Sequence, residues 1–151
     1  MKVIAALTFA FAIGTSAFAQ QQQQIPAPTL LSMKGGDTLP VRIVTFVTAT
    51  CDPLFLSFEG IDIMEGPPEV SLQFEPGMVH TFTPSRDCPK PVKGGTVMAT
   101  AAKDIAAQKE ALLTFRVRFT TKQGPWQYTV RYRVLLFPSG EPHEPTTATK
   151  Q

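Results

Sequence analysis

The sequence is poor in the side chains that most hydrolases and metal sites use. It contains two histidines, two cysteines and one tryptophan, and His80 is the only imidazole outside the C-terminal tail. No Ser, Thr or Cys nucleophile therefore has a recognisable partner base. The carboxylates of Asp62 and Glu65 lie in the turn-like stretch GIDIMEGPP, where solvated acids are expected. Gly94 and Gly95 do not open a helix after a phosphate-binding strand. We therefore expect a non-enzymatic protein without a cofactor.

A run of apolar residues long enough to span a membrane is also missing. The run VIAALTFAFAIG near the N-terminus is shorter than the roughly 20 residues that a transmembrane helix needs. It follows Lys2 and precedes the small residues TSAFA, a pattern typical of a secretory signal peptide. We predict a signal peptide at residues 1–19, no transmembrane segment, and a bacterial protein that is periplasmic or secreted.

The two cysteines, Cys51 and Cys88, lack the Cys-x-x-Cys spacing that lowers a thiol pKa in redox proteins. In a small exported domain, an even pair of cysteines indicates a disulfide. We predict that Cys51 and Cys88 are bonded. Closing a loop of this length stabilises a fold by roughly 3 to 4 kcal/mol in the chain-entropy description.

Charge is scarce and unevenly distributed. Without Lys2, 13 of the 14 basic residues remain against 12 acidic ones, and such a nearly neutral exported chain is unsuited to nucleic acid. Residues 52–75 contain no Lys or Arg, and residues 112–137 contain no acid. The acids of the first segment are Asp52, Glu59, Asp62, Glu65, Glu69 and Glu75, and the bases of the second are Arg116, Arg118, Lys122, Arg131 and Arg133.

The chain divides into four parts. After residues 1–19, the stretch QQQQQIPAP at 20–28 predicts a flexible leader, and residues 138–151 predict a disordered tail. Residues 29–137 are enough for one domain with its own core. The 14 prolines, 10 glycines and 11 phenylalanines of the chain are typical of an all-β protein with many turns.

Within 29–137, short apolar runs alternate with turn signals. About seven or eight strands at this spacing predict an all-β fold, an immunoglobulin-like β-sandwich with one short helical connection. The Cys-Trp-Cys order of antibody domains is absent, because Trp126 follows both cysteines. We predict a helical turn at Ala102–Ala111, an irregular loop at Pro84–Gly95, a tight turn at Glu75–Gly77, and strands at Thr29–Lys34, Pro40–Thr50, Leu54–Glu59, Glu69–Phe74, Met78–Thr83, Thr96–Ala101, Leu113–Thr120 and Trp126–Val134.

The last two strands carry four arginines that alternate with apolar residues. Because side chains alternate along a strand, placing the apolar set on the core puts Arg116, Arg118, Arg131 and Arg133 on the outer face. Like charges on neighbouring strands destabilise a hairpin, so this cluster predicts an anionic partner, either a protein of the cell envelope or an anionic surface polymer. We add Trp126 to this binding surface. An internal alternative is that acids of residues 52–75 neutralise the arginines.

A metal-handling function is a second hypothesis. Met78 and His80 lie two residues apart in GMVHTF and are soft ligands suited to copper in an exported protein. The late loop of electron-transfer copper proteins carries further ligands, whereas here PKPVKGG follows Cys88 and His143 stands alone in the tail. The alternative is a periplasmic copper-handling protein.

A third hypothesis comes from a limited resemblance. The tripeptides at 94–96 (GGT) and 124–126 (GPW) resemble in outline the loops by which some immunoglobulin-like bacterial protease inhibitors enter a protease cleft. Where these inhibitors carry an upstream loop containing Asn-Pro-Thr, this chain has CDPLF at 51–55. The resemblance implies inhibition through the loops at Gly94 and Gly124.

Overall fold

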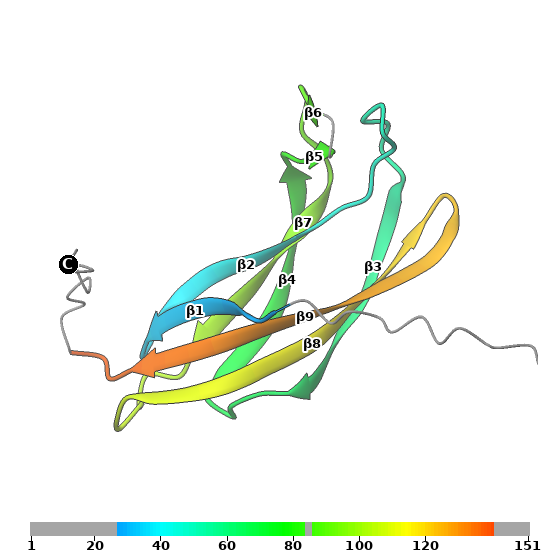
Figure 1. Cartoon of the computed structure of the whole chain (residues 1–151). Helices are drawn as coiled ribbons and strands as arrows, with labels where there is room; N and C mark the ends of the chain where they lie inside the picture. Colours follow the sequence, from blue (N-terminus) through cyan, green and yellow to red (C-terminus); the bar gives the residue numbers. More distant parts are fainter. Residues whose placement is uncertain (1–26, 84–85, 141–151) are drawn as a thin grey trace, which may run out of the picture.

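Two β-sheets pack against each other in the computed structural model, which describes residues 27–83 and 86–140 (Figure 1). One sheet has the order β1 (Thr29–Lys34), β9 (Gly124–Phe137), β8 (Lys109–Thr121) and β3 (Phe55–Glu65). The other has the order β2 (Thr38–Val44), β7 (Val92–Ala101) and β4 (Val70–Val79), and β5 (Phe82–Thr83) and β6 (Arg86–Asp87) form a separate short hairpin. The fold is therefore an all-β sandwich with seven strands in its two sheets, as predicted.

The expected signal peptide at 1–19 and most of the expected leader and tail lie outside the described residues. The described strands begin at Thr29 and end at Phe137. The orders β2-β7-β4 and β3-β8-β9 match two strand groups of an immunoglobulin domain, but β1 pairs in parallel with β9 instead of joining β2. The immunoglobulin-like assignment stays a prediction.

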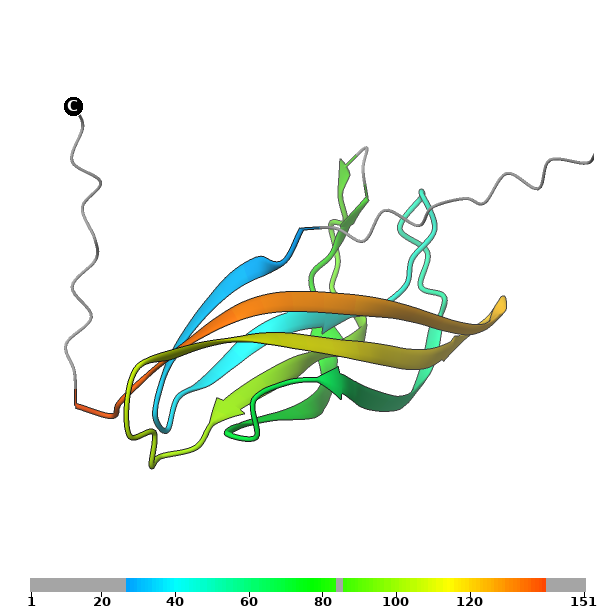
Figure 2. The ribbon, with the colours of Figure 1, turned by 60° about the horizontal axis from the view of Figure 1, so that its bottom comes forward.

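The core lies between the two sheets and is built by the expected alternation. The central strands β7, β8 and β9 direct every second side chain inward. Figure 2 shows the long β8–β9 hairpin, whose turn projects at one end of the molecule. The fully buried large side chains are Met33, Val44, Val97, Leu113, Phe115, Val117, Phe119, Val134 and Leu136.

The helical turn predicted at Ala102–Ala111 is wrong, because the described residues form no helix. Residues 102–108 are an irregular connection, and β8 already begins at Lys109, which pairs with Leu136 of β9. Ile105 of this connection is 7% exposed and belongs to the core. A helix of two turns is marginal by itself, whereas strand pairing satisfies the backbone and lets one apolar side chain close the core.

The tight turn predicted at Glu75–Gly77 and part of the loop predicted at Pro84–Gly95 are also wrong. β4 runs without interruption along β7 from Val70 opposite Ala101 to Val79 opposite Val92. Because β4 is an edge strand, Pro76 costs it no ladder hydrogen bond. The strand predicted at Pro40–Thr50, and expected to be central, is the edge strand β2, which begins at Thr38 and ends at Val44.

Candidate binding surface of the four-stranded sheet

All four predicted arginines lie on the outer face of β8 and β9. They are placed there by the hairpin register, which turns Leu113, Phe115 and Tyr132 toward the core. The sequence suggested that like charges lie opposite one another in the hairpin, but the register does not place any two of the arginines directly opposite each other. Each arginine instead faces an uncharged residue: Arg116 lies opposite Thr129, Arg118 opposite Gln127, Arg131 opposite Thr114, and Arg133 opposite Leu112.

Arg118 is neutralised within the molecule. Its Nε donates to Oδ2 of Asp62 at 2.8 Å and its Nη2 donates to Oδ1 at 3.3 Å. These hydrogen bonds, with the charge of Asp62, raise the pKa of Arg118 above its usual range. Asp62 belongs to β3 and not to the turn expected from the sequence. The alternation of Asp62 with the apolar Ile61 and Ile63 was the signal for a strand.

Glu59 stands close to this pair on β3. Its Oε1 accepts hydrogen bonds from the hydroxyls of Ser57 at 2.7 Å and Thr120 at 3.0 Å. These two bonds, with a smaller contribution from the charge of Arg118, hold the pKa of Glu59 below its ordinary value. A carboxylate is therefore fixed at the β3 side of the surface and repels anions there.

Arg133 has a weaker partner. Its Nε lies 3.4 Å from Oε1 of Glu110, and both side chains are more than half exposed. Glu110 is on β8 and not in the acidic segment 52–75 that the internal alternative proposed. The acidic segment therefore pairs with one of the four arginines, and a different acid pairs with a second.

Arg116 and Arg131 form no ion pair with any residue in the described part of the chain. Asp62 is the register partner of Arg116, but its carboxylate is bound by Arg118. Because Arg116 is opposite Thr129 and Arg131 is opposite Thr114, the two are diagonal neighbours, about 7 to 8 Å apart at the backbone. We call Arg116 and Arg131 the free arginine pair. Two guanidiniums this close can bind a carboxylate, sulfate or phosphate together.

Trp126 lies at the hairpin end of this sheet, on the inner face opposite the buried Phe119, and not on the outer face with the four arginines as predicted. It is 50% exposed, and its ring centroid lies 5.1 Å from that of Phe46 in the loop after β2. One part of the indole therefore packs on the sandwich and another part is open to solvent. Trp126 and Arg118 also line a shallow hollow of about 510 Å³ beside Gln127 and Glu59.

Next to Trp126 along β9, Tyr128 is covered by Arg42 of β2. The guanidinium carbon of Arg42 lies 5.2 Å from the Tyr128 ring centroid, within reach of a cation–π interaction. The hydroxyl of Tyr128 donates to the carbonyl of Ile43 at 3.5 Å. Burial raises the pKa of Tyr128, and the charge of Arg42 opposes this shift. The indole, phenol and guanidinium thus form one cluster at the β9 side of the hairpin.

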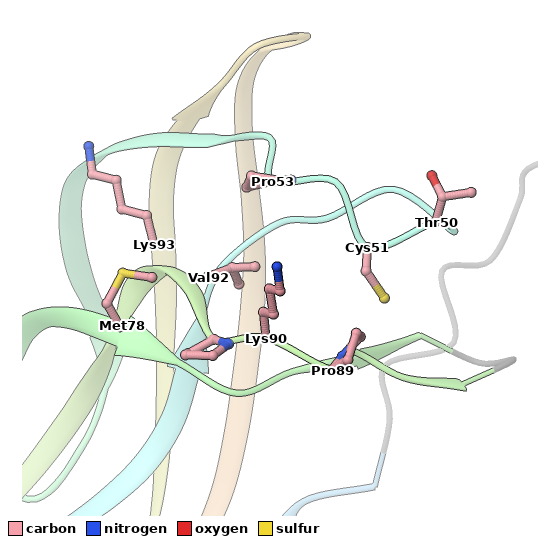
Figure 3. A pocket seen from close by; sticks show the side chains of 9 residues that line it. Thr50, Cys51, Pro53, Met78, Pro89, Lys90, Val92 and Lys93 are labelled. Carbon is pink, nitrogen blue, oxygen red and sulfur yellow. The ribbon is translucent and has the colours of Figure 1, made fainter.

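The candidate metal ligands Met78 and His80 do not meet in one site. Met78 is 64% exposed and borders a hollow of about 500 Å³, whose wall includes Lys90 and Lys93 (Figure 3). His80 borders another hollow, beside Asp87. Among residues 27–83 and 86–140, no three His, Cys, Asp or Glu side chains gather as a metal site would require. The cationic wall around Met78 disfavours a metal ion there.

The predicted disulfide is present. Cys51 and Cys88 are bonded, with their Cα atoms 5.6 Å apart, and they join the loop after β2 to the loop before β7. A structural disulfide indicates an oxidising compartment. The described part of the chain contains no helix that could cross a membrane.

The loops of the protease-inhibitor hypothesis are present only in part. Gly94 and Gly95 are inside the central strand β7, so no loop exists there. Gly124 does lie at the β8–β9 turn, with a φ of 115° that suits glycine. No family model, curated protein or solved structure matches the chain.

Proposed function

We propose that this protein is an exported, non-enzymatic binding module that recognises an anionic partner with the outer face of β8 and β9. The observation that supports this most directly is the free arginine pair, Arg116 and Arg131. On the same face, Arg118 and Arg133 each have a carboxylate partner. Two neighbouring guanidiniums without a counter-charge repel each other, and an anion between them removes that repulsion.

The surface is suited to binding because it is rigid. β8 and β9 are the two inner strands of the order β1-β9-β8-β3, and they are the longest strands of the described chain, with 13 and 14 residues. A preorganised surface loses little conformational entropy on binding. A protein of the cell envelope and an anionic surface polymer both offer the carboxylate or phosphate groups that arginine pairs bind.

Two features support export. The expected signal peptide at residues 1–19 would direct the chain out of the cytoplasm, and the disulfide requires an oxidising environment. Both conditions are met in a bacterial periplasm and outside the cell. In either place the free arginine pair would meet acidic proteins and polymers of the envelope.

The test compares two matched double variants. Arg116→Gln with Arg131→Gln removes the free arginine pair, and Arg118→Gln with Arg133→Gln removes the same charge from the same face. Fluorescent poly-glutamate and dextran sulfate serve as probes at low and at physiological ionic strength. We expect the first variant to bind the probes about tenfold more weakly, which is a loss of roughly 1.4 kcal/mol of binding free energy. Its affinity should also depend much less on ionic strength. The second variant should keep most of the affinity.

Equal losses in the two variants would show that only the total charge of the face matters, and absence of binding in the unchanged protein would refute the proposal. Thermal unfolding of both variants controls for folding. Capture from envelope extracts with the unchanged protein and with the Arg116→Gln, Arg131→Gln variant then identifies the partner, which should be retained only by the former.

A further inference from the structure

Half of the β9 edge is open. β1 pairs in parallel with β9 only from Thr29 opposite Tyr132 to Lys34 opposite Phe137. Within residues 27–83 and 86–140, residues 124–131 of β9 pair with β8 alone. An unpaired strand edge presents a row of N–H and C=O groups that another strand can use.

The ladder between β1 and β9 begins at Thr29. The residue before Thr29 is Pro28, which the parallel register would place beside Arg131. The N–H of Gly35 donates to the carbonyl of Phe137, so the odd-numbered residues of β1 direct their backbone groups to β9, and the nitrogen of Pro28 points away from β9. The open edge of β9 therefore begins where β1 begins, beside residue 28.

The backbone groups that face the open edge can be identified from Pro125. Pro125 lies within the β8–β9 ladder although it has no N–H, so its nitrogen points away from β8. Successive residues of a strand alternate in this direction. The N–H groups of Gln127, Thr129 and Arg131 therefore point to the open edge, together with the carbonyls of Gln127 and Thr129, whereas the carbonyl of Arg131 faces the start of β1.

Three other edges of the sandwich carry features that discourage pairing. On β2, the carbonyls of Val41 and Ile43 accept hydrogen bonds from the hydroxyls of Tyr132 and Tyr128. β3 has three register irregularities and outward acids, and β4 contains Pro76. Bulges, charges and proline are the usual means of blocking an edge. Residues 126–130 of β9 contain no proline, charged side chain or register irregularity, and Pro125 and Arg131 flank this stretch.

Both sides of the open edge have side chains that suit a bound peptide. On the inner side, Trp126 is 50% exposed and lies two residues from Tyr128, which contacts Arg42. On the outer side, Thr129 and Arg131 are two residues apart, and Arg131 belongs to the free arginine pair. Tryptophan, tyrosine and arginine are the residue types most often responsible for binding energy at interfaces.

We propose that the open edge of β9, residues 124–131, binds an extended segment of a partner protein whose acidic and apolar residues alternate. The side chains of an added strand point alternately to the two faces of the sheet. One set would reach Arg131 on the outer face, and the other would cover Trp126 on the inner face, beside the Arg42–Tyr128 contact. The inference rests on the proposed function and narrows its partner to a polypeptide bound by strand addition.

The probe is a short synthetic peptide in which Glu alternates with Val and Phe. Its controls are the same peptide with alternate backbone amides N-methylated, and a version with Lys in place of Glu. We expect the first peptide to slow amide hydrogen exchange at Gln127, Thr129 and Arg131, measured by NMR. N-methylation should weaken binding about tenfold or more, because it removes the strand hydrogen bonds, and the Lys peptide should not bind.

A variant pair tests the same edge from the protein side. Thr129→Pro removes one edge N–H and leaves the β8–β9 ladder intact, whereas Thr129→Val keeps that N–H. We expect that the Thr129→Pro variant no longer binds the peptide, whereas the Thr129→Val variant does. Both variants should still bind poly-glutamate, since the free arginine pair is unchanged. If Thr129→Pro does not fold, the N-methylated peptides decide the question.

The outcomes separate this inference from the proposed function. Peptide binding that survives both N-methylation and Thr129→Pro would overturn strand addition and leave the arginine proposal standing. Poly-glutamate binding that does not depend on Arg116 and Arg131 would overturn the arginine proposal. This holds even if the peptide slows amide exchange at the open edge. Slow amide exchange at residues 127–131 without peptide would show that the same chain already covers the edge. If the exchange slows further as protein concentration rises, a second copy covers it. Either result refutes the inference.

Discussion

At the scale of single residues, Gly94 and Gly95 show how closely the strands around β7 approach. A Cβ added at Gly95 would lie 2.4 Å from the carbonyl oxygen of Glu75 and equally close to the Phe74 ring. A Cβ at Gly94 would lie 2.3 Å from the carbonyl oxygen of Val44. These glycines are needed because backbone and ring atoms occupy the space of a side chain, and not because a loop is formed.

We predict that Gly95→Ala destabilises the protein by about 2 to 4 kcal/mol, since the clash forces the strands apart. Gly77→Ala is the matched control, because Gly77 is in the neighbouring strand β4 and no atom lies within 4 Å of its added Cβ. The free energy of unfolding of this variant should be between that of the unchanged protein and a value roughly 0.5 kcal/mol higher. Urea unfolding at neutral pH measures both, and similar losses in the two variants would contradict the packing described for Gly95.

At the scale of elements, two tyrosines of β9 hold the edge of β2 across the sandwich. Tyr132 donates its hydroxyl to the carbonyl of Val41, and Tyr128 donates to that of Ile43. Burial raises the pKa of both phenols above the ordinary value of 10.0. The two sheets are therefore joined by neutral phenols at the side where β9 is open.

These shifts predict a loss of stability at alkaline pH. In the unfolded chain a tyrosine releases its proton near pH 10, whereas the folded protein retains it to higher pH. The unfolded state then binds fewer protons, so the free energy of unfolding falls as pH rises through the raised pKa of the folded state. Below pH 10 the full contribution is present.

Tyr132→Phe tests this directly. It should cost about 1 kcal/mol at neutral pH through the lost hydrogen bond and should reduce the slope of stability against pH above pH 10. Urea unfolding over a pH series measures the slope. An unchanged alkaline slope in the Tyr132→Phe variant would show that the phenol is not protected from ionisation in the folded protein.

At the scale of the whole molecule, the disulfide joins two loops at one end of the sandwich. Cys51 and Cys88 are 37 residues apart in the sequence, and the bond lies between the loop after β2 and the loop that follows β6. Neither loop has extensive strand pairing of its own. The first loop contains an isolated bridge between Val47 and Pro53, and hydrogen bonds among Thr48, Thr50 and Asp52.

Replacing both cysteines by serine should lower the free energy of unfolding by about 4 kcal/mol, the value expected for a loop of this length. Urea unfolding of the variant and of the unchanged protein measures the difference, and intact mass with and without reductant verifies the bond. A reductant that changes neither the mass nor the midpoint would contradict the disulfide. Binding of poly-glutamate should persist in the variant, because the free arginine pair is on the paired strands β8 and β9.

Much of this fold could be predicted because it depends on local patterns. The alternation in β8 and β9 is a two-residue period that can be read directly from the sequence, so the buried Phe115 and the outward Arg116 follow from it. The helical turn at 102–111 and the turn at 75–77 were wrong for the opposite reason. There, pairing with β9 and β7 outweighs the local signals of alanine, proline and glycine.

By itself, the sequence determined that the chain forms an all-β sandwich, that Cys51 and Cys88 bond, and that four arginines share one face. Only the tertiary structure decided which arginines have partners and which edge is open. Asp62 meets Arg118 across 56 residues of sequence, and the extent of β1 along β9 sets the open edge. The physical reason is that alternation fixes the face of a side chain, whereas its neighbours on that face depend on strand order and register.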